Sequence, residues 1–321
     1  MYQLNNLRSQ ILFKSIACVG VVSLLVVVAL INLVPPASGY EISLYNAYPW
    51  YFWAALILAI FSGQLVILGS AIYREKRDRG WVFGVAIVLV SNAILLLMPY
   101  IRGYPIYGRA DVLTHLGYIK DLADVGIEGN IYPLMHLHTQ ALSHATGLPP
   151  SAVINFLPVV VSFVCFGGLF YLAVGLFDRP HALFCTLLTI IPFVGGSHTT
   201  VVPFTLSVLY VPFALYLLSK EQQTTAISIR VILVISIAGV ALYHPLTAVM
   251  LLPAFAMYVG LKQAEPFKSR WLGPTKVASL TTVIFTAWYL RFYGVITRFD
   301  TVFQRIVGRA ESASEFDSYT G

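Results

Sequence analysis

Apolar runs long enough to cross a lipid bilayer recur along most of this sequence, separated by short polar segments. A membrane-spanning helix needs about 20 predominantly apolar residues. The sequence predicts about nine spans, near residues 15–34, 48–73, 81–100, 152–177, 181–195, 201–218, 231–243, 246–261 and 277–288. Only 11% of the residues are charged, against about 25% in soluble domains. The expected fold is therefore all-α, a polytopic bundle of transmembrane helices.

Polar segments divide this predicted bundle into four parts. About three spans occupy residues 1–99, a long loop occupies 100–150, about six spans occupy 151–296, and a polar tail occupies 297–321. The seventh and eighth spans meet at His244–Pro245, where proline removes a backbone donor, so a broken pair that does not fully cross is the alternative there. The tail stops without a terminating motif, which leaves open that the chain is part of a longer protein.

Basic residues are distributed unevenly between the two sides of the predicted bundle. With a cytoplasmic N-terminus, 13 of the 20 lysines and arginines fall on the inner side and 7 on the outer side. Cytoplasmic loops of membrane proteins carry the excess of positive charge. We therefore expect a cell-membrane protein, surrounded by membrane lipid, with residues 100–150 outside. This orientation accounts for the net charge of +6 without nucleic acid as a partner.

Familiar cofactor and metal motifs are missing from the sequence. The three cysteines, Cys18, Cys165 and Cys185, lie inside apolar runs, and their spacing fits neither a metal site nor a disulfide framework. There is no glycine-rich phosphate or dinucleotide motif and no HExxH or CxxC signature. No metal site is predicted, although a divalent cation held between Asp111 and a bound phosphate stays open.

The loop at residues 100–150 is predicted to form two short helices. Leucine and isoleucine at helical spacing give the first one, about 111–125, an apolar stripe, as in a helix that lies on a membrane. The second covers about 132–145, with Pro133 in its first turn and Gly147 just past its end. A Gly-Asn turn joins the two helices.

Histidine and acidic residues gather in and around this loop. Asp111 and His115 are four residues apart and share one face of the first predicted helix. Six of the seven histidines fall on the predicted outer side, and such groups near an apolar surface are costly unless they are paired, solvated or functional. Structural interpretations stay open: Asp111 as a helix cap, the histidines as solvated residues, and the arginines as ligands of lipid phosphates.

The order of these motifs resembles the glycosyltransferase C superfamily. The matching segments are RADVLTH at 109–115, YPLMHL at 132–137 and TGLPP at 146–150. The resemblance covers about residues 100–262 and is greatest to archaeal members and to the dolichyl-phosphate-mannose protein mannosyltransferase-like group. Members are polytopic enzymes whose donors are lipid-phosphate-linked sugars. The resemblance therefore implies a membrane glycosyltransferase with a polyprenyl- or dolichyl-phosphate sugar as its donor.

The resemblance also implies roles for individual residues. The catalytic candidate of that superfamily is an acidic residue of an outer loop, which by position is Asp111; it would accept a proton from the acceptor hydroxyl or position that hydroxyl. The candidates for substrate binding are Arg102, Arg109, His115, Tyr132, His136, His138 and His244. Two other function classes remain open, namely a transporter or flippase of lipid-linked or polar substrates and a non-catalytic membrane subunit.

Overall fold

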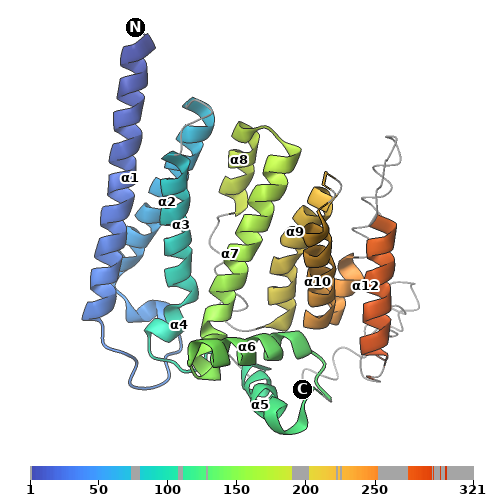
Figure 1. Cartoon of the computed structure of the whole chain (residues 1–321). Coiled ribbons are helices and arrows are strands. Elements are labelled where there is room, and N and C mark those ends of the chain that lie inside the picture. The colour runs from blue at the N-terminus through green and yellow to red at the C-terminus, as the bar shows by residue number, and fades with distance from the viewer. Residues whose placement is uncertain are drawn as a thin grey trace, which may run out of the picture.

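The structure of the chain is a computed structural model (Figure 1). It describes residues 2–73, 80–107, 111–127, 129–189, 202–221, 223–224, 226–251, 274–290, 292, 297 and 301, except for the side chains of residues 2–10, of Asp111 and of several other helix positions. Every regular element in these ranges is a helix, which confirms the predicted all-α class for this part of the chain.

The long helices are α1 (Tyr2–Leu33), α2 (Trp50–Tyr73), α3 (Gly80–Leu96), α7 (Pro150–Leu176), α8 (Arg179–Thr189), α9 (Pro203–Glu221), α10 (Ile227–Tyr243) and α12 (Pro274–Tyr289). The shorter elements at one end of the bundle are η1 (Leu44–Ala47), α4 (Met98–Ile101), α5 (Asp111–Val125) and α6 (Pro133–Thr146). Residues 245–251 form a further helical segment directly after α10.

In the described part of the chain, four helices are long and apolar enough to cross a membrane: Ile11–Leu33, Trp50–Ile72, Pro150–Leu176 and Pro203–Glu221. The chain is thus a membrane-embedded helical protein. The prediction of about nine spans is not confirmed, because α3 and α10 are shorter apolar helices and α8 and α12 have 11 and 16 residues. The second halves of the predicted fifth and eighth spans lie outside the described residues.

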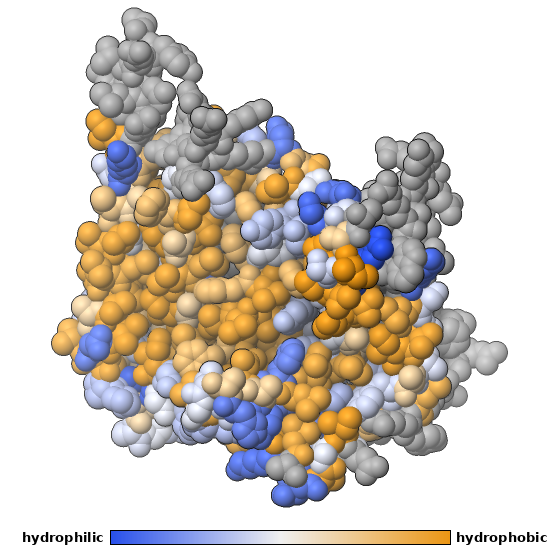
Figure 2. Space-filling model, in the orientation of Figure 1, coloured by the Kyte–Doolittle hydropathy of each residue, from blue (hydrophilic) through white to orange (hydrophobic). Residues whose placement is uncertain are grey.

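The long helices pack in two groups, with α1, α2 and α3 in one and α7, α9, α10 and α12 in the other. Helix α8 contacts both α2 and α7, so it bridges the two groups. Figure 2 shows apolar side chains in a broad band over the middle of the helices and hydrophilic ones toward the ends. Outward-facing Leu25, Phe83 and Ile235 are each more than 60% exposed, as expected for side chains in contact with lipid.

Glycines allow the closest helix crossings. A Cβ atom added at Gly84 of α3 would lie 2.6 Å from the carbonyl oxygen of Gly63 in α2, and one added at Gly168 of α7 would lie 2.5 Å from the backbone nitrogen of Phe213 in α9. Helices in membranes associate by such close backbone approach, because lipid gives little hydrophobic drive for helix pairing. One of these close crossings lies within each group of helices.

The two predicted loop helices are confirmed as α5 and α6, which lie across one end of the bundle (Figure 1). Helix α6 starts at Pro133 and ends where Gly147 adopts a left-handed conformation with φ of 72°, donating its N–H to the carbonyl oxygen of Ser143. Gly129 in the turn between the helices also has a positive φ, 75°. Both conformations suit glycine.

Candidate functional site

Four histidines lie where α6 packs against α5 and the end of α10. We call this group the histidine cluster; it comprises His115, His136, His138 and His244 together with Asn130, Tyr132 and Tyr243. Helix α6 contacts α5 and α10, so the cluster joins two consecutive helices to the end of a third; His138 and Tyr243 are 105 residues apart in the sequence. Helix α10 stops here because His244 is extended, with φ of −157°, and the following Pro245 has no N–H to donate.

The centre of the cluster is a chain of three buried side chains. Nδ1 of His136 lies 2.8 Å from Oδ1 of Asn130, and Nε2 of His136 lies 3.1 Å from Nδ1 of His115. His136 is fully buried, and Asn130 and His115 are buried almost as deeply. The His115 and His136 rings are tilted with centroids 5.2 Å apart. A polar chain of this depth is stable only because its members satisfy one another.

Two further contacts connect the loop helices to the membrane helices. Nδ1 of His138 lies 2.8 Å from the hydroxyl of Tyr243. The rings of Tyr132 and His244 are stacked, with centroids 5.3 Å apart and planes 3° apart. These pairs fix α6 and the residues before it against the end of α10, so the cluster is held by helices rather than by a free loop.

Burial lowers the pKa of two histidines of α6. Loss of solvation, with a smaller contribution from the nearby His115, lowers the pKa of His136 to about 3. Burial also lowers the pKa of His138. An imidazole that is neutral at pH 7 can donate or accept a hydrogen bond, but it supplies no positive charge. Both ring nitrogens of His136 are already engaged, by Asn130 and His115, and its assignment to substrate binding stays a prediction.

The structure relates the acidic and basic candidates to the histidine cluster in different ways. Helix α5 starts at Asp111, so the backbone of Asp111 lies one turn before His115, as the spacing predicted; its side chain and all of Arg109 lie outside the described residues. Arg102 is buried, and its contacts lie elsewhere. Its guanidinium forms a two-pronged ion pair with Glu41 and donates to the carbonyl oxygen of Pro35 at 2.6 Å.

The ion pair of Arg102 joins α4 to the segment between α1 and α2. Hydrogen bonding to Arg102 lowers the pKa of Glu41, and the guanidinium also lies 5.6 Å from the centroid of the Tyr48 ring. Arg102 thus has a clear structural role. Its assignment to substrate binding stays a prediction.

Sequence reasoning did not single out three residues that the structure brings into contact with the candidates. Glu41 pairs with Arg102, Asn130 holds His136, and Tyr243 holds His138. For Glu41 there was a signal, because it is an acidic residue between two predicted spans on the same side as Arg102. Asn130 was visible only as a turn residue, and Tyr243 only as the end of an apolar run.

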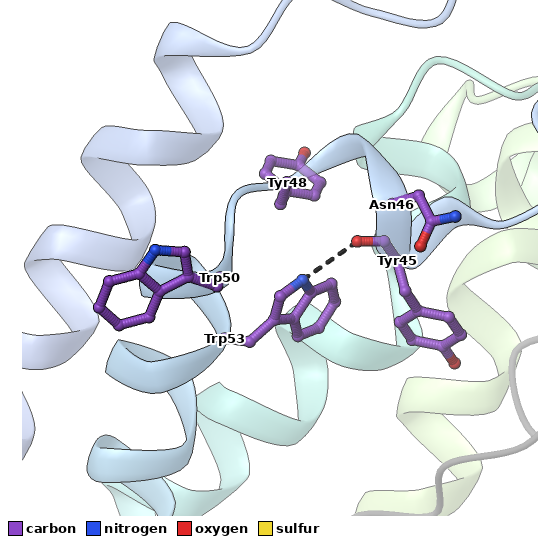
Figure 3. Close-up of a pocket in the computed structure, with 5 residues that line it drawn as sticks. All are labelled: Tyr45, Asn46, Tyr48, Trp50 and Trp53. Carbon is purple, nitrogen blue, oxygen red and sulfur yellow. Dashed lines mark hydrogen bonds between the residues drawn. The ribbon is translucent and has the colours of Figure 1, made fainter.

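An open hollow of about 520 Å³ lies at the same end of the molecule, next to α2 (Figure 3). Its walls are Tyr45, Asn46, Tyr48, Trp50 and Trp53. The indole N–H of Trp53 donates to the carbonyl oxygen of Tyr45 at 3.1 Å. Tryptophan and tyrosine prefer the membrane–water interface, so this aromatic group marks where α2 enters the membrane.

The described residues contain no group of three or more His, Cys, Asp or Glu side chains that could hold a metal ion. The side chain of Asp111 is not among those residues, so a divalent cation at Asp111 remains untested. No protein-family model, curated protein or solved structure matches the chain. Its function must therefore be argued from the histidine cluster and its surroundings.

Proposed function

We propose that the chain is a membrane glycosyltransferase that transfers a sugar from a polyprenyl- or dolichyl-phosphate donor to an acceptor hydroxyl at the outer membrane face. The observation that carries the proposal is that His115 and His244 both contact the ring of Tyr132 while His136 contacts His115. His115 lies one turn from the start of α5 at Asp111. Buried imidazoles and phenols next to a predicted carboxylate are the groups that proton transfer to and from a sugar hydroxyl requires.

The location of the cluster suits a lipid-linked donor. It lies at the end of membrane-embedded helices, where a donor with its tail in the bilayer would hold its sugar phosphate. Asp111 would activate or orient the acceptor hydroxyl. Arg109 would pair with the leaving phosphate, because a guanidinium binds phosphate through two hydrogen bonds. Tyr132 and His244 would contact the sugar.

The test is a transfer assay on purified protein in lipid, with a polyprenyl-phosphate sugar as donor. Asp111→Asn is expected to lower kcat by at least about 100-fold, because loss of a group that activates or orients the acceptor hydroxyl has an effect of this size. Asp121→Asn is the matched control, because Asp121 is an exposed aspartate on the same helix and its loss should leave kcat unchanged. Full activity of Asp111→Asn refutes the catalytic role.

The same preparation separates the proposal from its main alternative. In proteoliposomes loaded on one side with the donor, a flippase moves the intact lipid-linked sugar across the bilayer and releases no transferred product. A glycosyltransferase forms product without net movement of the donor. Donor movement without product therefore overturns the proposed function in favour of transport.

We also propose that the N-terminus is cytoplasmic and that residues 100–150 lie outside a cell membrane. The test uses a variant without the native cysteines, labelled in intact cells with a membrane-impermeant maleimide. A cysteine at exposed Thr146, the last residue of α6, should react at once. A cysteine at exposed Gln223, between α9 and α10, should react only after permeabilisation. The reverse pattern overturns the orientation.

A further inference from the structure

The hydrogen bonds around Asn130 determine which of its side-chain atoms is the oxygen. The backbone N–H of Tyr132 donates to Oδ1 of Asn130 at 3.1 Å, and only an oxygen can accept that hydrogen. The same Oδ1 lies 2.8 Å from Nδ1 of His136. Because an amide oxygen only accepts, Nδ1 of His136 must carry a hydrogen and donate it to Asn130.

The tautomer of His136 in turn determines which nitrogen of His115 carries a hydrogen. His136 is fully buried and neutral, so its single ring hydrogen is on Nδ1 and its Nε2 is a bare acceptor. Nδ1 of His115 lies 3.1 Å from that acceptor and must therefore be the donor. In neutral His115 the lone pair is then on Nε2, at the far side of the ring from His136.

The opposite arrangement holds at His244. The backbone N–H of Leu246 donates to Nδ1 of His244 at 3.2 Å, so that nitrogen is the acceptor and Nε2 carries the hydrogen. The cluster thus contains one histidine with a basic Nε2, His115, and one with a donating Nε2, His244. A site that removes a proton from one oxygen and hydrogen-bonds to another needs both kinds of group.

We propose that Asn130 and His136 hold His115 in the Nδ1–H tautomer so that Nε2 of His115 takes the proton from the acceptor hydroxyl. This proposal rests on the glycosyltransferase function proposed above, and it leaves to Asp111 the role of orienting the hydroxyl. Asn130 and His136 are positioning residues, because they act through His115. The same logic orients the catalytic histidine of hydrolase triads, where a carboxylate or amide fixes its tautomer.

The step balances in atoms and charge. The O–H bond of the acceptor breaks and its proton moves to Nε2 of His115. The acceptor oxygen forms a bond to the anomeric carbon of the sugar, and the bond from that carbon to the phosphate oxygen breaks. The electron pair leaves with the polyprenyl phosphate. Histidine is the side chain that most often serves as a general base in such a proton transfer.

The first experiment needs no substrate. Ring ¹⁵N NMR of the full chain in lipid nanodiscs reports the tautomer of each histidine, assigned by single substitutions. His115 and His136 are expected as Nδ1–H and His244 as Nε2–H, each favoured by about ten to one or more, because the other tautomer breaks the hydrogen bonds at the ring nitrogens. His115 found as Nε2–H, or His136 found protonated on both nitrogens at pH 7, overturns the proposal.

A matched pair of substitutions tests the coupling between the rings. His136→Gln keeps an oxygen near the position of Nε2 that can accept from His115, whereas His136→Leu removes the acceptor. The Nδ1–H form of His115 should persist in His136→Gln and lose its excess in His136→Leu. An unchanged His115 spectrum in His136→Leu shows that the relay does not exist.

The transfer assay then tests the proton step. His115→Gln and His136→Leu should lower kcat by about 100-fold with little change in KM, and His136→Gln should retain at least ten times more kcat than His136→Leu. His144→Leu, an exposed position on the same helix, is the control. A His115→Gln variant with wild-type kcat overturns the step. If the wild type transfers no sugar from any lipid-linked donor, the proposed function fails and the step with it, while the NMR result still decides the relay.

Discussion

The buried His136 is expected to make the protein acid-sensitive. Its imidazole is fully buried at the centre of the histidine cluster, and its pKa is about 3 in the folded protein. In the unfolded chain it would titrate at the ordinary value of 6.5. Below pH 6.5 the unfolded chain therefore binds a proton that the folded chain does not, and the stability of the folded state falls as the pH falls.

The size of the effect follows from these two pKa values. Each pH unit between them costs about 1.4 kcal/mol, so acidification from pH 7 to pH 5 should lower the free energy of unfolding by about 2 kcal/mol through His136 alone. At pH 5 this figure depends on the unfolded pKa and is insensitive to the folded value, as long as the latter stays below about 4.

The assay is thermal unfolding in detergent, followed by tryptophan fluorescence at pH 7 and pH 5. The wild-type melting temperature should fall by on the order of 5 °C more than that of His136→Gln, because glutamine has no proton to gain. His144→Gln, which alters an exposed histidine of α6, should behave as the wild type does. Equal acid shifts in wild type and His136→Gln would falsify the reasoning from burial.

Three further predictions concern packing and pairing. Gly168→Ala should destabilise the chain by about 1–3 kcal/mol, because the alanine Cβ would lie 2.5 Å from the α9 backbone. The control is Gly167→Ala, which has no such neighbour within 4 Å and should melt as the wild type does. Arg102→Lys should not restore the stability lost in Arg102→Leu, since only a guanidinium makes the two-pronged contact to Glu41; equal melting of the lysine variant and wild type contradicts this. Tyr243→Phe should cost about 1 kcal/mol by loss of the bond to His138, and a double-mutant cycle with His138→Phe giving no coupling energy is the contrary result.

Local features of the sequence were sufficient for the elements around the site. The apolar stripe predicted α5, and the proline in its first turn predicted α6, each within one or two residues. The glycine after α6 has the left-handed conformation expected of a helix end. The break at His244–Pro245 was also visible, because a missing backbone donor acts on its own helix. The prediction of about nine spans is not confirmed, since the described parts of α8 and α12 have only 11 and 16 residues.

By itself, the sequence determined that this chain is a bundle of membrane helices with two short helices in one polar loop. Hydropathy, helix periodicity and turn chemistry depend on neighbours a few residues away, so they can be read along the chain. The tertiary structure alone decided which polar groups meet. His138 and Tyr243 are 105 residues apart, and Arg102 and Glu41 are 61 apart. Such pairs depend on how whole helices pack, and the tautomer of His115 follows from that packing.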